Sequence, residues 1–422
     1  MNKTLMACAI ALACMPVAHA QSATTPASAV TLYGLVDAGV MHVTGLRGGN
    51  RTFVASGLME GTRWGLRGNE DLGGGYRALF TLESRVEADT GGLGSRPLSG
   101  LQVPDRLASA AALGLPAALQ PAVTAAGAGV AAAAFGVNLN NALFDRQAYV
   151  GLVTPFGAFL AGRQYTPAYE IVGTYDALKT ESGLSAGQVA SFPAGVDIRL
   201  SNTLAYRVQA ANFSGVAMYG AGETAGGNSR GRFWGGGAQD KSQPFSAGIG
   251  YNTRNDELGQ KSLTTLAVGT NIAVGPGDLS LLFGDVKNDN PSGLSTLAAT
   301  LGAGGVPAAG AVAIQAAFTS ALRQDGQLFH AGYRFKAHER GTLTVAFNKY
   351  DDKTRFNADT VSYGVAYTYA LSKRTDFNVV LTHFDNRGQG QSAPGQAGFV
   401  GGVTDTAGTD SNSFAIGLRH RF

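Results

Sequence analysis

Apolar and polar residues alternate along most of the chain, which is the period of a β-strand whose two faces meet different surroundings. The clearest example is 413–422, whose apolar face consists of Phe414, Ile416, Leu418, His420 and Phe422. The opposite face of this segment is small or basic and consists of Ala415, Gly417, Arg419 and Arg421. The segments 327–336, 342–348 and 361–371 repeat the pattern, with aromatic residues near their ends. The pattern predicts an all-β protein.

Sixteen segments have this strand character. They are 30–42, 58–69, 75–87, 144–153, 158–165, 198–208, 212–221, 229–238, 244–253, 262–274, 278–287, 327–337, 342–351, 361–371, 376–385 and 412–422. Tight turns such as 154–157 alternate with long connections such as 88–143 and 166–196. This asymmetry is typical of bacterial transmembrane barrels, whose turns are short on one side and long on the other. We therefore expect an antiparallel up-and-down barrel of about 16 strands, which is wide enough to enclose an aqueous lumen.

The arginines on the small polar faces support a barrel over a soluble sandwich, because a packed core would not tolerate them unpaired. Composition agrees. Glycine accounts for 60 of the 422 residues, about twice the usual ~7 %. Charged residues make up 14 %, against a usual ~25 %. The formal net charge of +3 is nearly balanced, which disfavours a nucleic-acid partner.

The first 20 residues have the pattern of a signal peptide. A lysine at position 3 precedes an apolar stretch, and Ala-His-Ala at 18–20 forms the small-residue exit. The stretch is too short to cross ~30 Å of hydrocarbon as a helix. We expect cleavage after residue 20, export, and a single barrel domain over 21–422. Both cysteines, Cys8 and Cys14, would be removed, so we expect no disulfide, no thiolate metal site and no cofactor.

Two long, almost uncharged segments, 107–137 and 294–322, are rich in alanine and glycine. Each could be helical in pieces, but Pro116, Pro121 and Pro307 interrupt them. A membrane-spanning helix is disfavoured, because alanine and glycine insert weakly. We place both in loop insertions near 95–141 and 290–324, where they could fold over the mouth of the barrel.

Several strings resemble the trimeric general porins of Gram-negative outer membranes. They are VTLYGLVDAGV (30–40), TRWGLRGNEDLGGGYRALFTLES (62–84), FDRQAYVGL (144–152), GAFLAGRQYTPAY (157–169) and FAIGLRHRF (414–422). The resemblance covers nearly the whole chain after residue 20, apart from the two insertions. It implies a homotrimer of sixteen-stranded barrels, an inward-folded third loop, and passive diffusion of ions and small hydrophilic solutes. It also implies residence in the outer membrane, with lipid and lipopolysaccharide around the barrel.

The resemblance further implies a pore constriction, with arginines on the wall and acids on the third loop. The wall positions correspond to Arg63, Arg146 and Arg199. Strand alternation independently places Arg63 and Arg67 on the lumen face and Arg199 beside lumen-facing Ser201 and Thr203, while the face of Arg146 is less clear.

The third loop, 166–196, offers Asp176 as the best acid, with Glu170 and Glu181 as further candidates, although the usual end of that loop is missing. The arginines would give a weak anion preference. Alternatively, these charges only pair with one another and pin the loop.

Phe422 resembles the terminal aromatic signal that the barrel-assembly machinery reads, and it could equally be a lipid-facing aromatic residue. A substrate-selective channel for a sugar or an organic anion remains the alternative function, although most aromatic residues point outward. Catalysis is disfavoured, because the histidines at 42, 330, 338, 383 and 420 lie in no nucleophile, metal-protease or clustered-acid motif.

Overall fold

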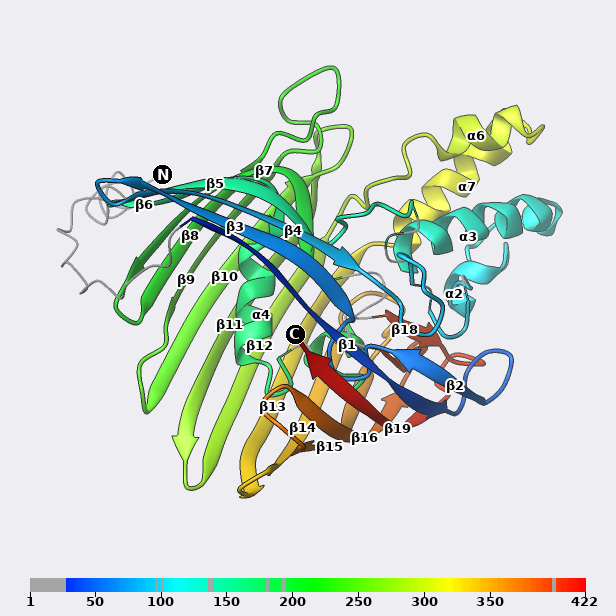
Figure 1. The fold of residues 1–422 in the computed structure, drawn as a ribbon. Helices are drawn as coiled ribbons and strands as arrows, with labels where there is room; N and C mark the ends of the chain where they lie inside the picture. Colours follow the sequence, from blue (N-terminus) through cyan, green and yellow to red (C-terminus); the bar gives the residue numbers. More distant parts are fainter. Residues whose placement is uncertain are drawn as a thin grey trace.

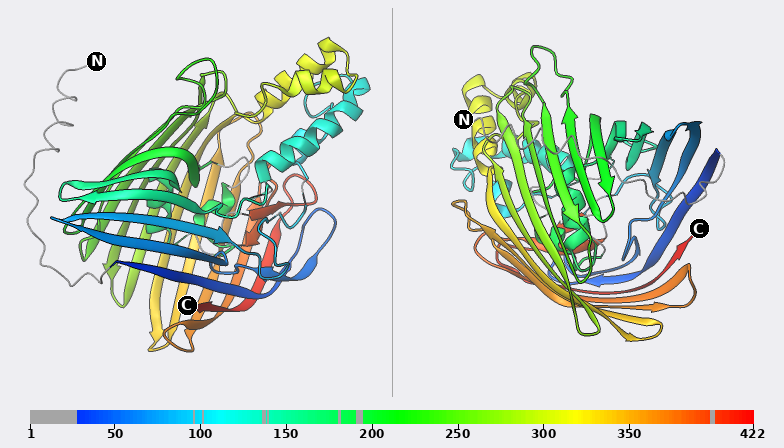
Figure 2. Two further views of the ribbon diagram at one scale, coloured as in Figure 1. Left: turned by 45° about the horizontal axis from the view of Figure 1, so that its top comes forward. Right: turned by 90° about the vertical axis from the view of Figure 1, so that its left-hand side faces the viewer.

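The computed structural model describes residues 28–95, 97–100, 102–135, 138, 140–179, 182–190, 195–396 and 400–422. The expected signal peptide, 1–20, lies outside these residues. The described chain forms one large antiparallel sheet and a separate small hairpin. The first strand of the large sheet, β1 (Ala29–Val43), pairs with its last strand, β19 (Ser411–Arg421), so the sheet closes on itself. Figure 1 shows these strands as a curved wall that encloses helix α4, and Figure 2 shows the same wall from two further directions.

The strand bounds agree with the alternation in the sequence. The strands are β1 (Ala29–Val43), β2 (Arg51–Ser56), β3 (Arg63–Gly73), β4 (Tyr76–Arg85), β5 (Gln147–Thr154), β6 (Gly157–Tyr165), β7 (Arg199–Ala210), β8 (Phe213–Gly220), β9 (Phe233–Asp240), β10 (Phe245–Asn255), β11 (Lys261–Val274), β12 (Gly277–Asn288), β13 (Gln324–His338), β14 (Gly341–Asp352), β15 (Thr360–Ala370), β16 (Thr375–Asn386) and β19 (Ser411–Arg421). A small separate hairpin, β17 (Ser392–Gln396) and β18 (Val400–Val403), lies between β16 and β19.

The barrel has sixteen strands because β2 and β3 share one position in the wall. β2 pairs with β1 along Ala38–Val43, and β3 pairs with β1 along Ala29–Leu35. Between them, the buried carboxylate of Asp37 accepts hydrogen bonds from the backbone N–H groups of Leu58, Met59 and Glu60, at 3.2, 2.8 and 2.6 Å. The predicted count of sixteen is confirmed. The predicted strand 58–69 is corrected to β3, Arg63–Gly73, and β2, Arg51–Ser56, precedes it across this capped turn.

Short turns and long loops fall at opposite ends of the strands, as the sequence predicted. The long loops that concern us are L2 (86–146), L3 (166–198), L6 (289–323) and L8 (387–410). They contain α2 (Asp105–Ala108), the 3₁₀ turn η2 (Ala117–Leu119), α3 (Gln120–Phe135), α4 (Pro167–Tyr175), α5 (Ala186–Val189), α6 (Leu297–Ala303) and α7 (Ala308–Ala321). No helix in the described part of the chain is long and apolar enough to cross a membrane.

The alanine- and glycine-rich loops are helical, and their prolines begin helices rather than interrupt them. Pro116 precedes η2, Pro121 lies in the first turn of α3, and Pro307 precedes α7. This is the position at which proline is tolerated, because the first N–H groups of a helix have no partner within it. Figure 1 shows the helices of L2 and L6 projecting together from the loop end of the barrel, beyond the mouth that we expected them to cover.

The helices of L2 and L6 share a hydrophobic core of their own, which we call the helical lobe. Its fully buried members include Leu107 and Val123 from L2 and Ile314 and Phe318 from L6. The start of L6 is held by Glu257, whose carboxylate accepts hydrogen bonds from the backbone N–H groups at 293 and 295. Burial alone would raise the pKa of Glu257, but these hydrogen bonds outweigh it and lower that pKa.

The base of the lobe is fastened to the barrel by charged side chains. Arg47 of the β1–β2 loop pairs with Asp105 of α2 and donates to the carbonyl of Val103 at 2.8 Å. The neighbouring Arg106 lies 3.7 Å from Asp352 at the end of β14, and its guanidinium stacks over Phe356. Burial lowers the pKa of Arg106 from its ordinary value. These contacts join L2 to three other segments at the rim of the barrel.

Candidate pore constriction

Loop L3 folds into the barrel and lies against one wall. Helix α4 contacts β9, β10, β11 and β12, and its buried face consists of Ala168, Ile171, Val172 and Tyr175. Figure 2 shows α4 inside the curve of these strands. This position confirms the predicted inward-folded third loop. Because L3 occupies one side of the lumen, the open path is confined between L3 and the wall opposite.

Polar side chains of the wall hold L3 along its length. Asn252 of β10 accepts the N–H of Ala168 at 3.1 Å and donates to the hydroxyl of Thr166 at 2.8 Å. Farther along, Asn348 of β14 donates to the carbonyl of Leu184 at 2.8 Å, and Thr265 of β11 donates to the carbonyl at 195. Side-chain amides and hydroxyls therefore satisfy backbone groups of the loop that water cannot reach.

Asp176 lies in the contact between L3 and the wall, and its side chain is fully buried. Its two carboxylate oxygens accept the backbone N–H groups of Leu178 at 2.9 Å and Ala186 at 3.0 Å. His330 of β13 lies 3.8 Å from the same carboxylate, and its Nε2 accepts the N–H of Ala177 at 3.0 Å. The structure thus places this acid where it shapes and fastens the loop, in line with the pinning alternative.

Glu170 is the acid of L3 that faces a wall arginine. It lies in the first turn of α4, and both its oxygens accept hydrogen bonds from the guanidinium of Arg207 of β7, at 3.0 and 2.7 Å. The two side chains are each about a quarter exposed. The pair joins the start of α4 to β7, the strand into which L3 leads. Glu181, the third predicted acid, lies outside the described residues.

Arg63 and Arg146 share one buried carboxylate, that of Glu83 on β4. The Nε of Arg146 lies 2.7 Å from Glu83 Oε1, and the Nε of Arg63 lies 3.6 Å from Oε2. Arg63 also pairs with Glu60, in the capped turn between β2 and β3. Tyr33 of β1 donates its hydroxyl to Glu83 at 3.0 Å. Two of the predicted wall arginines are therefore brought together by an acid that the motif comparison did not single out.

Arg67 and Arg199 have aromatic partners and, among the described residues, no carboxylate within 4 Å. The guanidinium of Arg67 lies 3.8 Å from the centre of the Tyr33 ring. That of Arg199 lies 4.6 Å from the centre of the Tyr165 ring and donates to the Tyr165 hydroxyl at 3.0 Å. Tyr165 stacks in turn on Tyr169 of α4, with ring centres 5.2 Å apart. The arginine wall thus extends to the root of L3.

Besides Asp37 and Glu83, the structure adds four charged residues that our site prediction did not include. Arg419 and Arg421 of β19 both pair with Glu60, at 3.1 and 3.2 Å, and with Asp376 of β16, at 3.2 and 2.8 Å. The alternation in 413–422 had already placed the two arginines on the polar face. Their acid partners could not be inferred, because strand register is not visible in the sequence. Together, these residues are six arginines and four carboxylates: Arg63, Arg67, Arg146, Arg199, Arg419, Arg421, Asp37, Glu60, Glu83 and Asp376. Beside them on β4, Arg85 pairs with both Asp145 and Glu87, so arginines still outnumber carboxylates, seven to six.

Phe422 closes the barrel. Its backbone exchanges two hydrogen bonds with Gly34 of β1, at 3.2 and 3.0 Å. The Phe422 ring lies over Gly34, where any side chain on β1 would collide with it. Phe422 as a whole remains about half exposed.

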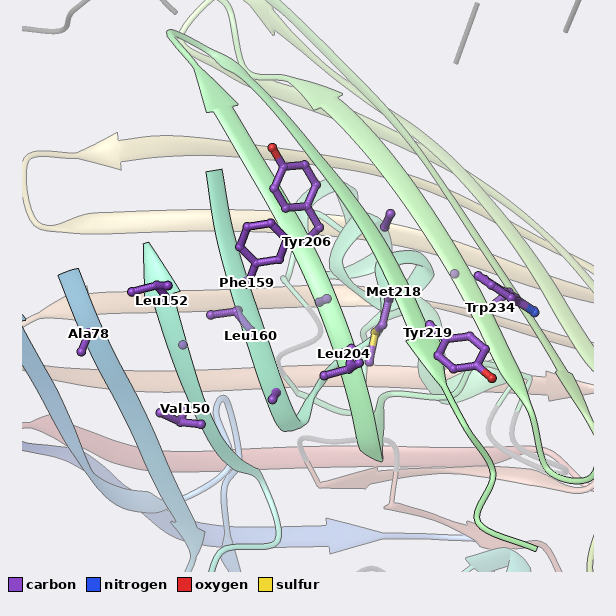
Figure 3. A pocket seen from close by; sticks show the side chains of 15 residues that line it. Ala78, Val150, Leu152, Phe159, Leu160, Leu204, Tyr206, Met218, Tyr219 and Trp234 are labelled. Carbon is purple, nitrogen blue, oxygen red and sulfur yellow. The ribbon is translucent and has the colours of Figure 1, made fainter. Parts of the chain in front are cut away.

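An apolar groove of about 560 Å³ runs along the outer face of β4–β9. Two aromatic pairs flank Leu204 there, as Figure 3 shows: Phe159 with Tyr206, and Tyr219 with Trp234. The ring centres in these pairs are 4.8 and 4.5 Å apart. The groove therefore lies on the outer surface of the wall and is separate from the lumen.

Nothing in the described residues forms a group of three or more histidine, cysteine, aspartate or glutamate side chains that could hold a metal ion. The arrangement that the structure does build is a lumen whose open path runs between a fastened loop and a wall with more arginines than carboxylates.

Comparisons with known proteins agree with this architecture. A family model for Gram-negative porins matches residues 6–389. Outer membrane porin protein 32 of Delftia acidovorans is 27% identical over 445 aligned positions, covering 100% of both chains. An outer membrane porin protein of Bordetella pertussis is 35% identical over 105 residues, which cover 22% of this chain and 26% of that protein.

Among solved structures, an anion-selective porin from Comamonas acidovorans superposes with a TM-score of 0.67 at 22% identity, covering 94% of this chain and 100% of that one. OmpT of Vibrio cholerae superposes with a TM-score of 0.57 at 13% identity, covering 96% of this chain and 100% of that one. At these low sequence identities, the superpositions show that the chains share a fold.

Proposed function

The chain belongs to the Gram-negative porin family and is an outer-membrane channel, and we propose that it passes small hydrophilic solutes by diffusion with a weak preference for anions. The excess of arginines over carboxylates on the lumen wall carries the proposal. Arg67 and Arg199 in particular have no carboxylate partner among the described residues. A positive wall raises the local concentration of anions and lowers that of cations. The Comamonas neighbour, described as anion-selective, is consistent with this preference.

The preference for anions is weak because carboxylates neutralise most of the positive charge of the wall. Glu83 and Glu60 neutralise much of the charge of Arg63 and Arg146. We infer that Asp176 contributes to the narrowing by fastening L3 rather than by facing the solute. Glu170 is paired with Arg207 of β7 and therefore adds little net charge. The proposed channel has no catalytic role.

Single-channel recording tests the proposal. The purified, unheated protein is inserted into planar bilayers under a KCl gradient, and conductance and reversal potential are measured. Ohmic steps with a reversal potential of anion sign support a weakly anion-selective porin, whereas a cation-sign potential refutes the preference. A substrate-selective channel would be favoured instead if one sugar or organic acid blocked the ion current in a saturable way and its homologues did not.

We propose that the channel assembles as a homotrimer and that a second copy covers the groove on β4–β9. Strands β5, β6, β8 and β9 have only 8 or 9 residues. At ~3.3 Å per residue and a tilt of ~45° they span roughly 20 Å, less than the ~25 Å apolar band of an outer-membrane barrel. The 14- and 15-residue strands β11 and β13 exceed that band. A short wall suits a protein neighbour, which need not match the lipid.

Tryptophan quenching tests which neighbour covers the groove. The chain has two tryptophans, so Trp64→Phe leaves Trp234 as the only reporter. In bilayers containing brominated acyl chains, we expect the fluorescence of Trp234 to resist quenching in the oligomer and to be quenched in the dissociated monomer. Strong quenching in the oligomer would mean that lipid fills the groove. The matched Trp234→Phe protein reports on Trp64 in the same membranes.

We further propose that residues 1–20 are removed on export and that Phe422 is read during assembly. Sequencing of the N-terminus of the purified outer-membrane protein should begin at Gln21. Deletion of Phe422 should reduce the amount of assembled barrel more than Phe422→Tyr does, because tyrosine keeps an aromatic end. Equal loss from both changes would refute a role for the ring. The outward apolar faces would meet lipid and lipopolysaccharide.

A further inference from the structure

The strands beneath α4 carry glycine at the inward positions that the helix covers. Five such glycines lie under α4, on three neighbouring strands, and we call them the glycine floor: Gly235 and Gly237 of β9, Gly248 and Gly250 of β10, and Gly269 of β11. On these strands the alternate, outward positions hold large apolar side chains such as Trp234, Ile249 and Val268. On β10 and β11 every glycine is therefore on the face that meets L3, whereas β9 also has one outward glycine, Gly236.

Helix α4 lies so close to the glycine floor that no side chain would fit at the floor positions. A Cβ at Gly269 would lie 2.4 Å from the Cβ of Tyr175. At Gly250 it would lie 2.6 Å from the carbonyl oxygen of Pro167 and 2.8 Å from the Cα of Ala168. Carbon atoms in contact prefer separations of ~3.5–4.0 Å, so even alanine requires a shift of about 1 Å. Because two of these neighbours are backbone atoms, the helix itself would have to move.

The helix can move in one direction only. The wall is fixed by its strand pairing, and the register of β10 with β9 and β11 is continuous through Gly248, Gly250 and Gly269. The other side of α4 faces the lumen. Under the neighbouring part of the loop, by contrast, the wall presents large residues, including Leu282, Leu328 and Phe384. L3 therefore lies deepest where the floor is made of glycine.

We propose that the glycine floor sets the width of the pore: the depth to which α4 sinks into the wall determines how far it protrudes into the lumen. The inference rests on the channel function proposed above and adds the residues that determine its size limit. Glycine weakens a strand, because it packs nothing and loses more conformational freedom on folding. At these positions the close helix contact offsets that loss. Substitutions at the floor should narrow the channel without touching the arginine wall.

The test compares Gly269→Leu and Gly250→Leu with Gly236→Leu in planar bilayers. Gly236 lies on β9 between two floor residues but faces outward, and a Cβ there would meet nothing closer than 3.8 Å. We expect single-channel conductance to fall roughly two-fold in the floor variants, because conduction follows the cross-section of the constriction. We expect Gly236→Leu to conduct like the original protein. Equal conductance in all three assembled variants would overturn the proposal.

Alanine variants guard against failure to assemble. Gly269→Ala and Gly250→Ala add a single methyl group, and assembly is checked by the mobility of the unheated protein on gels. We expect a smaller conductance loss than with leucine, and a size-dependent loss in liposome swelling, larger for a trisaccharide than for a monosaccharide. A loss that is equal for every solute, or no loss in the assembled alanine variants, would refute the proposal. The conductance of the original protein tests the channel function separately.

Discussion

Replacing Arg199 by glutamine should weaken the anion preference of the channel without disturbing its fold. The Arg199 guanidinium is partly exposed, donates to the Tyr165 hydroxyl and has no carboxylate partner among the described residues. Its loss leaves no buried acid without a countercharge. Glutamine keeps a neutral N–H donor, on a side chain that is two bonds shorter. The substitution therefore changes mainly the electrostatic potential along the open path.

The size of the effect follows from Coulomb's law. An ion ~4 Å from a guanidinium in water gains or loses about 1 kcal/mol. At 0.1 M salt the Debye length is about 10 Å, which leaves roughly two-thirds of this energy. Anion occupancy at closest approach then falls about three-fold, and cation occupancy rises by the same factor. We expect at least a three-fold fall in the anion-to-cation permeability ratio at 0.1 M KCl, and a smaller fall at 1 M.

Reversal potentials in KCl gradients measure this ratio. Arg387→Gln is one control, because Arg387 is two-thirds exposed and pairs with Asp385 outside the lumen. A second control is the double variant Arg146→Gln with Glu83→Gln, which removes one charge of each sign and should leave the ratio nearly unchanged. An assembled Arg199→Gln channel with an unaltered ratio at 0.1 M would refute the reasoning that the arginine wall sets selectivity.

Three other outcomes are expected. Glu83→Gln alone should lower the stability of the barrel by about 3 kcal/mol, because it leaves Arg146 buried without a countercharge. The heating temperature at which the protein loses its folded mobility on gels should therefore drop. An unchanged temperature would contradict the shared-carboxylate geometry. Phe318→Ala should lower the stability of the helical lobe by about 3 kcal/mol and make it sensitive to protease, while single-channel conductance stays unchanged. Loss of conductance would show that the lobe and the pore are coupled. The lowered pKa of Glu257 predicts that its contribution to the stability of L6 is complete above the ordinary glutamate pKa and is lost as the pH falls through the lower, folded value. The protection of the amides at 293–297 against hydrogen exchange, relative to the intrinsic rate at each pH, should therefore fall in acid, and this pH dependence should be lost in Glu257→Gln.

The sequence predicted the barrel well because each strand carries its own signal. Alternation in 361–371 and 413–422 is visible without knowledge of any partner, and β15 and β19 form at these positions. The hairpin β17–β18 was missed because Ser392–Gln396 does not alternate and is held by contacts with L3. The two-part strand β2–β3 was missed because its turn depends on Asp37, which lies on β1 and reaches the turn only through strand pairing.

The constriction was harder to predict. Sequence motifs and alternation indicate which face of a strand a residue occupies, but they do not indicate which side chain it pairs with. Arg63 and Arg146 were found, yet the acid that joins them, Glu83, was not, because it reaches them only through the pairing of β4 with β3 and β5. Asp176 was predicted as the main acid of the constriction, but nothing in its sequence context indicates that the carboxylate turns back to accept N–H groups at 178 and 186. Loop conformation decided that direction.

Closure between β1 and β19 has a consequence for the order in which the barrel can form. The two strands that seal the sheet come from opposite ends of the chain, and Phe422 makes its hydrogen bonds to Gly34 only when both are in place. Until then the sheet has two edges with unpaired N–H and C=O groups, which can bind any other extended strand. Every earlier hairpin can form locally, whereas the last pairing must overcome the entropy of joining distant segments. A chain that ends before β19 would thus form an open sheet that is prone to pair with other strands. The step of barrel formation that most needs a catalyst is the final pairing of β1 with β19.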